Sequence, residues 1–410
     1  MKTSDFLVVG GGIWGLSTAY HLAARGAGSV RLLERNAELA DETTPRAAGL
    51  VGQIRSSPTM CAAIRYALDL LEGFAAETGH DPGLRRPGSL MVALTEERME
   101  AYRRLIDLAG RTGVRASLTG RGEMKRMCPE MEVERLEGGL FVEGDGYVDA
   151  RQCALAYAAA AREKGVEIEC GVEVDGFTFQ DGSACGVSTG SGPRAAGRVI
   201  VTCGPWTGRI ARIAGLELPM QTIRHQRART VPVGGIPEDH PTVRVTDASC
   251  YLRPDQGGYL FGFFEPEPHL VDLDELPAGF RSSDVAEPRE TIAEARRRLI
   301  PCFPVLAGLE IAEYRQGITS FAPDGRYLIG PVPGVEGMIV ASGCAAVGIA
   351  GSAAVGRWLA EWATGGEPGA ELEEFGLLRF GEQAGDRGWV RERSREFYAG
   401  YYSIESMEGG

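Results

Sequence analysis

The chain begins with a short apolar run, which is followed by a cluster of glycines and then by an amphipathic run. Residues 5–9, apolar after Asp5, are too few and too rich in strand-forming types for a helix, so they predict a buried strand. Helical spacing follows over Ile13–Ala24, and "SVRLLER" predicts a second short strand that ends at Glu34. This order of strand, glycine loop, helix and strand is typical of a βαβ unit.

Two more helices can be placed from the residues at their ends. A loop of small residues at 42–57 leads into a helix that we expect to end near Gly79. Asp149, with Gln152 three residues later, is a candidate N-cap, and Gly165 marks the end of that helix. One strand follows Gly165, and another, in "GRVIVTCGPW", runs into a Gly-Pro turn.

The pattern changes in the second half of the chain. Residues 218–264 contain β-rich segments separated by Pro and Gly, which predict a second sheet of a different kind. A charged helix is expected around 290–300, and the segment from 323 onward predicts a turn, two strands, a small-residue loop and a helix. The chain therefore leaves its first domain and returns to it, so the domains are discontinuous.

The glycine cluster points to a ligand. Gly10, Gly12 and Gly15 fit the G-x-G-x-x-G pattern between the first strand and its helix. Gly10 permits a tight turn, Gly12 lets the backbone approach a pyrophosphate, and Gly15 lets helix and strand pack closely. Glu34 ends the second strand, where a dinucleotide-binding unit places its ribose-binding carboxylate. Glycines also serve simple turns, but these elements together indicate a dinucleotide site, without saying which dinucleotide it binds.

Composition limits the kinds of binding partner and the cellular compartment that we expect for this protein. A net charge of −13 argues against nucleic acid and anionic membrane surfaces, and no segment has the roughly 18 unbroken apolar residues of a membrane span. The nine cysteines include no C-x-x-C pair and the five histidines no i, i+4 pair, so we expect neither a metal site nor a disulfide framework. No signal peptide is recognisable, and we expect a cytoplasmic protein with reduced thiols.

The chain resembles the FAD-dependent oxidoreductases of the D-amino-acid oxidase/glycine oxidase type. The segments that carry the resemblance are, in order, "VVGGGIWGLSTAYHLAARG", "TTPRAAGLVGQIRSS", "DPGLRRPGSLMVALTEERM", "RHQ", "YLRPDQGGYLFGFFEP", "PDGRYLIGP" and "RGWVRERSREFYAGYY". Within that family it most resembles the amine-oxidising domain of dimethylglycine and sarcosine dehydrogenases. The resemblance implies FAD-dependent oxidation of a secondary or N-substituted amino acid to an imine, which water hydrolyses.

The resemblance also implies the fold class, an α/β protein of the glycine oxidase/sarcosine oxidase type with a Rossmann-like FAD-binding domain interleaved with a β-rich substrate domain. The FAD-binding domain would comprise 1–80, 145–215 and 325–370, the substrate domain 81–144 and 216–324, and a C-terminal tail at 371–410 would pack on the core. The positions that match cofactor-binding segments are Gly10, Gly12, Ile13, Trp14, Gly15, Glu34, Arg35, Thr44, Arg46, Ala47, Ala48, Gly49, Val174, Gly204, Trp206, Gly343, Gly348 and Ile349. The loop and helix start at 343–349 would offer N–H groups to the flavin.

Four residues match the substrate side of the family's site. His225 and Tyr251 match a pair that lines the flavin in dimethylglycine-type enzymes and would favour the neutral amine or accept its proton. Arg55 aligns with an arginine that holds the substrate carboxylate, and Arg253 is a second candidate clamp. Each has a structural alternative: a hydrogen-bonded histidine, an edge-strand tyrosine, or an arginine that caps a helix or pairs with an acid.

Substrate size is expected to depend on the small-residue loop near the end of the chain. Related enzymes place an arginine or lysine there to hold a small carboxylate, whereas this chain has Ala346 and Ala350. The freed space would admit an N-substituted glycine whose substituent is bulkier than methyl. The alternative is that small residues only let the following helix pack tightly.

The chain also departs from its relatives at the positions of covalent flavin links. Arg46 replaces the histidine that tethers FAD in the dehydrogenases, and "RQGITSFAPDG" lacks the cysteine used by monomeric sarcosine oxidases, so we expect non-covalent FAD. The oxygen-activating lysine of those oxidases aligns near Leu260. The electron acceptor is therefore either oxygen or an electron carrier. A non-catalytic flavoprotein regulatory subunit of the same fold is the rival to an enzyme.

Overall fold

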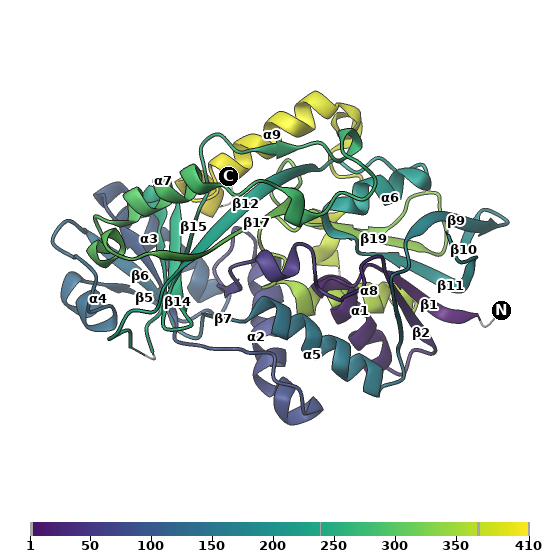
Figure 1. The fold of residues 1–410 in the computed structure, drawn as a ribbon, viewed down its shortest axis with the longest axis horizontal. Coiled ribbons are helices and arrows are strands. Elements are labelled where there is room, and N and C mark those ends of the chain that lie inside the picture. Colours follow the sequence, from purple (N-terminus) through teal and green to yellow (C-terminus); the bar gives the residue numbers. More distant parts are fainter. Residues whose placement is uncertain (1–2, 238, 367–369, 409–410) are drawn as a thin grey trace.

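A computed structural model gives the fold and describes residues 3–237, 239–366 and 370–408. Two large sheets lie side by side along the long axis of the molecule (Figure 1). The predicted domain ranges include 1–2, 238, 367–369 and 409–410, which lie outside the described residues. The chain passes from the first sheet to the second and back, so each sheet is assembled from segments far apart in the sequence.

The first sheet is parallel except at its edges, and its main strands run in the order β18-β19-β11-β1-β2-β8. β1 pairs in parallel with β11 and β2, and β8 and β19 continue that arrangement. The strands are β1 (Ser4–Val9), β2 (Val30–Glu34), β8 (Glu167–Cys170), β9 (Val174–Gln180), β10 (Ser183–Thr189), β11 (Arg194–Val201), β18 (Leu328–Pro331) and β19 (Met338–Ser342). Ligands bind to such sheets beyond the carboxyl ends of the strands, which places a candidate site after β1, β2, β11 and β19.

Helices cover both faces of this sheet. They are α1 (Ile13–Ala24), α2 (Pro58–Thr78), α5 (Ala150–Glu163), α6 (Thr207–Ile213) and α8 (Ser352–Ala363). Phe6 and Val8 of β1 pack with α1, α5 and α8, whereas Leu7 and Val9 pack on the opposite face with α6. Burial on both faces explains why this strand is apolar without interruption from Phe6 to Val9.

Local signals predicted the ends of several helices. The helix predicted over Ile13–Ala24 is α1, with the same bounds. The Asp149 carboxylate accepts a hydrogen bond from the Gln152 N–H at 2.8 Å and caps α5. Gly79 takes a left-handed conformation with φ of 78° and ends α2, which only glycine adopts without strain.

The second sheet is mainly antiparallel, with the order β16-β12-β15-β14-β13-β4-β6-β5 and with β17 also paired to β12. Its strands are β4 (Ser89–Ala93), β5 (Ala116–Thr119), β6 (Gly138–Val142), β12 (Gln221–Thr230), β13 (Thr242–Val245), β14 (Cys250–Asp255), β15 (Gly258–Phe263), β16 (Leu270–Val271) and β17 (Ile311–Phe321). A small ribbon of β3 (Leu50–Val51) and β7 (Gly146–Tyr147) is separate from both sheets. The β-rich pattern predicted over 218–264 corresponds to β12 to β15.

The remaining helices belong to the second half of the fold and to the C-terminal tail. They are α3 (Glu96–Arg111), α4 (Arg121–Met127), α7 (Arg289–Leu299), α9 (Arg387–Ala399) and α10 (Ile404–Glu408). The charged helix predicted around 290–300 is α7. In Figure 1, α9 lies along β12, and its Tyr398 side chain is fully buried. The tail therefore contributes side chains to the interior beside the second sheet.

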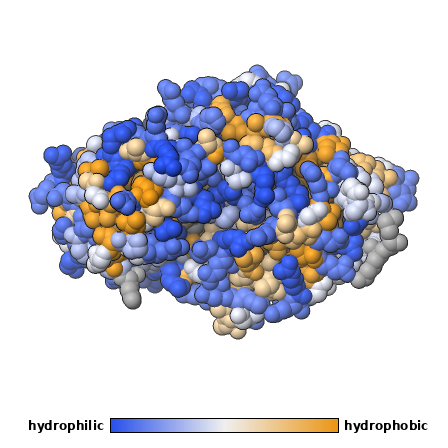
Figure 2. Space-filling model, in the orientation of Figure 1, coloured by the Kyte–Doolittle hydropathy of each residue, from blue (hydrophilic) through white to orange (hydrophobic). Residues whose placement is uncertain are grey.

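The surface is mostly polar. Figure 2 shows hydrophilic residues over most of one face, with smaller apolar areas between them. Large apolar side chains with substantial exposure include Leu118, Phe179, Ile213 and Leu378, which come from separate elements. None of the described helices combines the length and the apolar character that a membrane crossing needs.

Candidate functional site

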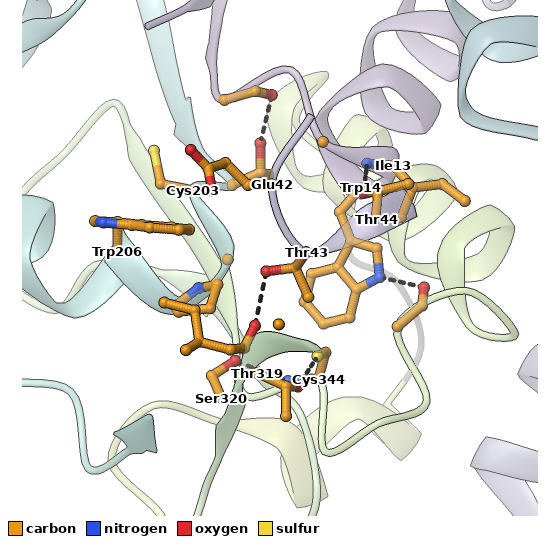
Figure 3. Close-up of a pocket in the computed structure, with 18 of the residues that line it drawn as sticks. Ile13, Trp14, Glu42, Thr43, Thr44, Cys203, Trp206, Thr319, Ser320 and Cys344 are labelled. Atoms are coloured by element: carbon orange, nitrogen blue, oxygen red, sulfur yellow. Dashed lines mark hydrogen bonds between the residues drawn. The ribbon is translucent and has the colours of Figure 1, made fainter. Parts of the chain in front are cut away.

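A cavity of about 410 Å³ lies between the two sheets. Its walls come from the loops after β1, β2, β11 and β19, from the facing surface of β12, β14 and β17, and from the C-terminal tail. Figure 3 shows side chains from the segments after β1, β2, β11 and β19 and from β17 around it. The cavity thus begins at the carboxyl edge of the parallel sheet, where the βαβ pattern predicts a ligand.

The glycine loop is shaped by close contacts. Gly10 has φ of +106°, and a Cβ atom there would lie 2.7 Å from the Thr202 carbonyl oxygen. A Cβ atom at Gly15 would lie 1.9 Å from the Gly10 carbonyl oxygen, so Gly15 permits the close packing predicted for it and does not itself line the cavity. A Cβ atom at Gly12 would meet only the Thr44 hydroxyl oxygen, at 3.6 Å. Space above Gly12 is therefore open to a ligand.

Glu34 is held beside this loop by the backbone. Its Oε2 accepts a hydrogen bond from the Gly11 N–H at 2.6 Å, and its Oε1 accepts one from the Asn36 N–H at 2.8 Å. Burial raises the pKa of the Glu34 carboxyl, and these two hydrogen bonds oppose that rise. Each carboxylate oxygen keeps a second lone pair, which a ribose hydroxyl could use.

Three hydrogen bonds join the loops around the cavity (Figure 3). The Thr44 hydroxyl accepts from the Ile13 N–H at 3.2 Å, and the Thr43 hydroxyl donates to the Ile318 carbonyl at 2.8 Å. The Trp14 indole N–H donates to the Gly348 carbonyl at 2.8 Å. These contacts fix the segment after β2 against the start of α1, and α1 against the loop after β19.

Arg46, at the position of the tethering histidine, also lines the cavity. Its guanidinium donates to the carbonyl oxygens of Asp41 and Glu42. A Cβ atom at Gly317 would lie 2.9 Å from the Arg46 Cδ, so the glycine makes room for this side chain. The Arg46 guanidinium is therefore hydrogen-bonded to the backbone of its own loop.

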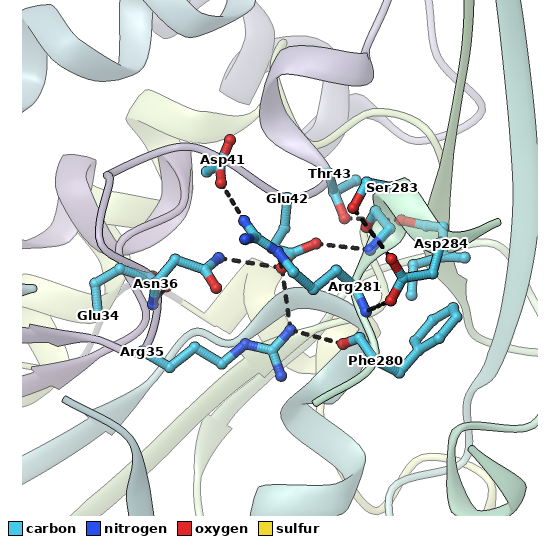
Figure 4. Close-up of polar contacts among 12 residues, drawn as sticks. Glu34, Arg35, Asn36, Asp41, Glu42, Thr43, Phe280, Arg281, Ser283 and Asp284 are labelled. Carbon is cyan, nitrogen blue, oxygen red and sulfur yellow. Dashed lines mark hydrogen bonds and ion pairs between the residues drawn. The ribbon is translucent and has the colours of Figure 1, made fainter. Parts of the chain in front are cut away.

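A polar cluster closes the outer edge of the cavity (Figure 4). The Glu42 carboxylate accepts hydrogen bonds from the Arg35 guanidinium at 3.1 Å and from the Ser282 N–H at 2.8 Å, and Arg281 pairs with Asp41. The Arg35 guanidinium also stacks on the Trp206 ring at 4.3 Å. The cluster ties the loop after β2 to the segment between β16 and β17.

The loop after β19 differs from the prediction. The sequence predicted a helix start within 343–349, but Ala345 and Ala346 adopt left-handed φ values of 44° and 59°, and α8 begins only at Ser352. Gly343 and Ala350 do not line the cavity, and Ala350 is 1% exposed within the helical core. The structural alternative, tight packing of a small residue, is therefore the correct one for Ala350.

The same loop still presents backbone donors to the cavity. In the part of the chain that the structure describes, the N–H groups of Ala346, Gly348 and Ile349 have no hydrogen-bond partner, and these three residues line the cavity. The N–H groups of Gly343 and Cys344, by contrast, donate to the Ser320 hydroxyl. Backbone N–H groups that lack a partner can donate to a ligand atom that carries negative charge.

His225 and Tyr251 lie together on the second-sheet side of the cavity. The His225 Nε2 atom is 3.0 Å from the Tyr251 hydroxyl, and its Nδ1 atom is 2.8 Å from the Tyr398 hydroxyl. Burial lowers the pKa of His225 to about 3, and the charge of Arg224 adds to the effect. Burial also raises the pKa of both tyrosines. The imidazole is therefore neutral and hydrogen-bonded to two neutral phenols.

The sheet register places these groups on one face. Tyr251 of β14 pairs with Arg244 of β13 on one side and with Gly262 of β15 on the other. Residues directly opposite one another on neighbouring strands share a face. A Cβ atom at Gly262 would lie 2.1 Å from the Tyr251 hydroxyl oxygen, so the tyrosine ring leans across this glycine toward His225.

The two arginines that were predicted to bind the substrate carboxylate, Arg55 and Arg253, do not both line the cavity. Arg55 lines the cavity, but Arg253 does not. The Arg253 guanidinium donates to the Ala48 carbonyl, pairs with Asp255 at 2.8 Å and stacks on the Tyr147 ring. Its prediction as a second substrate clamp is wrong, because these partners occupy the guanidinium away from the cavity.

Sequence reasoning missed three residues that line this wall, Arg244, Tyr401 and Tyr402, and a fourth, Tyr398, that contacts His225. Arg244 has no motif, and only strand pairing brings it beside Tyr251. The three tyrosines belong to the segment "FYAGYY" of the C-terminal tail, for which the sequence predicts packing on the core. Tyr398 does pack, but its hydroxyl also holds His225.

Most of the predicted cofactor residues surround the cavity. Those that line it are Gly10, Gly12, Ile13, Trp14, Glu34, Arg35, Thr44, Arg46, Ala47, Ala48, Gly49, Val174, Gly204, Trp206, Gly348 and Ile349. The open backbone at Gly12, the carboxylate of Glu34 and the free N–H groups after β19 fit the pyrophosphate, ribose and flavin parts of FAD respectively.

Comparisons with known proteins show which family this sequence matches. A protein family described as FAD dependent oxidoreductase matches residues 5–362. The 4-methylaminobutanoate oxidase (formaldehyde-forming) of Paenarthrobacter nicotinovorans is 31% identical over 409 residues, which cover 98% of this chain and 49% of that protein. The mitochondrial sarcosine dehydrogenase of Homo sapiens is 32% identical over 412 residues, covering 98% of this chain and 44% of that protein. The chain spans about half the length of these relatives.

A solved structure shows the same fold. L-proline dehydrogenase from P. horikoshii matches with a TM-score of 0.83, covering 94% of this chain and 99% of that chain, at 23% identity. The predicted fold class, an FAD-binding fold of the glycine oxidase type with mixed α/β sheets, is confirmed. The chain belongs to the FAD dependent oxidoreductase family.

Proposed function

We propose that this protein oxidises the C–N bond of a secondary, N-substituted amino acid to an imine, which water then hydrolyses. The observation that supports this most directly is the neutral His225, hydrogen-bonded to Tyr251 in the wall of the cavity whose other side fits FAD. FAD, when bound, supplies the acceptor for the hydride equivalent. The protein's own residues bind and orient the amino acid and manage its proton.

The proton of the amine is the part of the reaction that His225 and Tyr251 can control. A protonated amine has no free electron pair on nitrogen and does not readily release hydride from the adjacent carbon. A neutral imidazole has one acceptor nitrogen, and the Tyr251 hydroxyl lies 3.0 Å from Nε2. The Tyr251 hydroxyl can donate to His225 Nε2 and accept a hydrogen bond from the N–H of the neutral amine, so this buried, uncharged pair favours the neutral form of the substrate, and Tyr398 fixes the ring through Nδ1.

We propose an N-substituted glycine with a substituent larger than methyl as the substrate. Ala346 lines the cavity where related enzymes carry a long basic side chain, so volume is available there. Ala350 adds nothing to that volume, because it lies in the helical core. The proposal therefore depends on Ala346 alone, and each further methylene that the cavity buries should improve binding by about 0.8 kcal/mol.

Anaerobic mixing of the FAD-loaded protein with a series of amines tests both statements. Sarcosine, longer N-alkyl glycines and N-carboxyalkyl glycines should bleach the visible absorption of the flavin, with kcat/KM rising along the series until the cavity is full. Sarcosine or glycine as the best substrate by tenfold would contradict the larger substituent. Absence of bleaching with every amine would instead favour the regulatory subunit.

FAD is expected to be held without a covalent bond. The guanidinium of Arg46 is hydrogen-bonded to its own loop, and the segment before "PDG" contains no cysteine. Acid precipitation should therefore release yellow flavin into the supernatant, where its absorption spectrum identifies it. Yellow colour that stays with the protein pellet would show a covalent link at another residue.

A further inference from the structure

The side chain of Tyr398 comes from the C-terminal tail and ends at His225. The residue lies in α9 and is fully buried, and its ring packs against Phe264 with the ring centroids 5.1 Å apart. Its hydroxyl is 2.8 Å from the His225 Nδ1 atom. Either of these two atoms can be the donor in this contact, and the choice decides which nitrogen of the imidazole carries the proton.

The hydrogen bonds on the two sides of His225 are coupled. A neutral imidazole donates through one ring nitrogen and accepts through the other. In one arrangement, Nδ1–H donates to the Tyr398 hydroxyl and Nε2 accepts the proton of the Tyr251 hydroxyl. In the other, the Tyr398 hydroxyl donates to Nδ1, and Nε2–H donates to the Tyr251 oxygen. Both arrangements fit the same distances, so the remaining partners of the two phenols decide between them.

The distances around the Tyr251 hydroxyl favour the first arrangement. This hydroxyl lies 3.0 Å from the His225 Nε2 atom and 3.5 Å from the Gln226 carbonyl oxygen. Hydroxyl donors usually lie about 2.5–3.0 Å from an acceptor oxygen, so the contact with the carbonyl is a poor one. Tyr251 is buried, and a buried phenol needs an acceptor for its proton. Donation to Nε2 meets that need and leaves the proton of the ring on Nδ1.

The Gln226 side chain favours the same arrangement from the side of Tyr398. Gln226 is 1% exposed, and its Nε2 donates to the Phe263 carbonyl at 3.0 Å, which fixes the orientation of the amide. Its Oε1 atom is buried and has no hydrogen-bond partner among the described residues. Burial raises the pKa of the Tyr398 phenol, and the neighbouring Gln226 side chain opposes that rise. A Tyr398 hydroxyl that turns its proton toward this unmet oxygen accepts, rather than donates, at His225.

We propose that Tyr398 and Gln226 hold His225 as its Nδ1–H tautomer. Tyr251 then donates its proton to Nε2 and presents only lone pairs to the substrate amine. This inference rests on the proposed function for the identity of the substrate, but the tautomer is a property of the site before any amine binds.

The tautomer matters because it selects the part of the amine that Tyr251 engages. An oxygen that presents lone pairs accepts the N–H of a neutral amine and leaves the electron pair on nitrogen free. With the opposite tautomer, the Tyr251 proton would be free to bond that electron pair, which oxidation of the C–N bond requires. Tyr398 and Gln226 are therefore positioning residues that act through His225.

Nitrogen-15 NMR of the FAD-loaded protein, with labelled histidine and without amine, tests the tautomer directly. The protonated and unprotonated nitrogens of a neutral imidazole give well-separated signals, and those of His225 are the ones missing from His225→Ala. In the wild type we expect a protonated Nδ1 and an unprotonated Nε2. A protonated Nε2 in the wild type overturns the inference, whatever the state of Nδ1.

Two variants should each move the proton to Nε2. Tyr398→Phe removes the acceptor for Nδ1–H, and Gln226→Met removes the acceptor for the Tyr398 proton. Flavin reduction by an amine should slow by about tenfold in each, the factor that one hydrogen bond can contribute. Tyr157→Phe is the matched control, because Tyr157 is fully buried in the helical core outside the cavity. It should change neither the tautomer nor the rate.

The outcomes separate this inference from the proposed function. An unchanged Nδ1–H form in Tyr398→Phe overturns the inference, even where Gln226→Met fails to fold. The Nδ1–H form in the wild type, and its loss in Tyr398→Phe, support the inference. If the same wild-type protein is bleached by no amine, the positioning network stands and the proposed function is overturned.

Discussion

Replacing His225 with alanine is expected to slow reduction of the bound flavin by about 10²–10⁴-fold while FAD stays in place, because a positioned acid–base group is lost. The imidazole is neutral and holds the Tyr251 hydroxyl at 3.0 Å, so its removal leaves that phenol without its hydrogen-bond partner. Anaerobic stopped-flow measurement of flavin absorption gives the rate directly. Tyr251→Phe, which keeps the ring and deletes the hydroxyl, should show a loss of similar size.

A second buried histidine provides the control. His240 is fully buried and pairs with Glu130 at 2.6 Å, away from the cavity. His240→Ala should lower the melting temperature and leave the reduction rate of the remaining folded protein unchanged. Wild-type kinetics in both His225→Ala and Tyr251→Phe would place the proton chemistry elsewhere in the cavity.

The low pKa of His225 also predicts how stability depends on pH. The folded-state pKa of about 3 lies below the ordinary value of 6.5, so between these values the unfolded chain binds a proton that the folded chain does not. The contribution of His225 to stability is therefore complete above pH 6.5 and is lost as the pH falls toward 3. His21, whose pKa burial lowers to about 4, acts in the same direction.

The sequence was sufficient for the features that depend on neighbours along the chain. The glycine loop, the bounds of α1 and the cap of α5 follow from local backbone requirements, and all three lie where they were predicted. The positions of Glu34 and of His225 and Tyr251 came from spacing and from the family resemblance, and the structure places all three in one cavity. The roles of these residues stay predictions until the variants are measured.

The sequence was insufficient wherever strand pairing decides which residues meet. Arg253 is two residues from Tyr251 and was an obvious candidate, yet its guanidinium stacks on Tyr147 and pairs with Asp255. The sequence around Arg244 carries no signal for a site residue, because only the register between β13 and β14 brings it opposite Tyr251. Tyr398 was missed for the same kind of reason, since α9 reaches β12 from the other end of the chain.

Replacing Gly262 with alanine is expected to slow flavin reduction by about 10²-fold, although the side chain of Gly262 performs no chemistry. A Cβ atom there would lie 2.1 Å from the Tyr251 hydroxyl oxygen and 2.8 Å from the Gln226 carbonyl oxygen. The buried tyrosine must then move away from His225, and a displacement of about 1 Å in a reacting group can cost that factor in rate. FAD should stay bound, because Gly262 does not line the cavity.

A double-mutant cycle shows whether Gly262 acts through Tyr251. In a Tyr251→Ala background the clash with the ring is absent, so Gly262→Ala should change the reduction rate little further, and the two effects should be strongly non-additive. A structural role would instead lower the melting temperature in both backgrounds and leave kcat unchanged, since the sheet would be disturbed with or without the tyrosine. Additive losses in rate would contradict the positioning role. Strong non-additivity, with FAD retained in all four proteins, would show that the absence of a side chain at Gly262 allows the Tyr251 hydroxyl to reach His225.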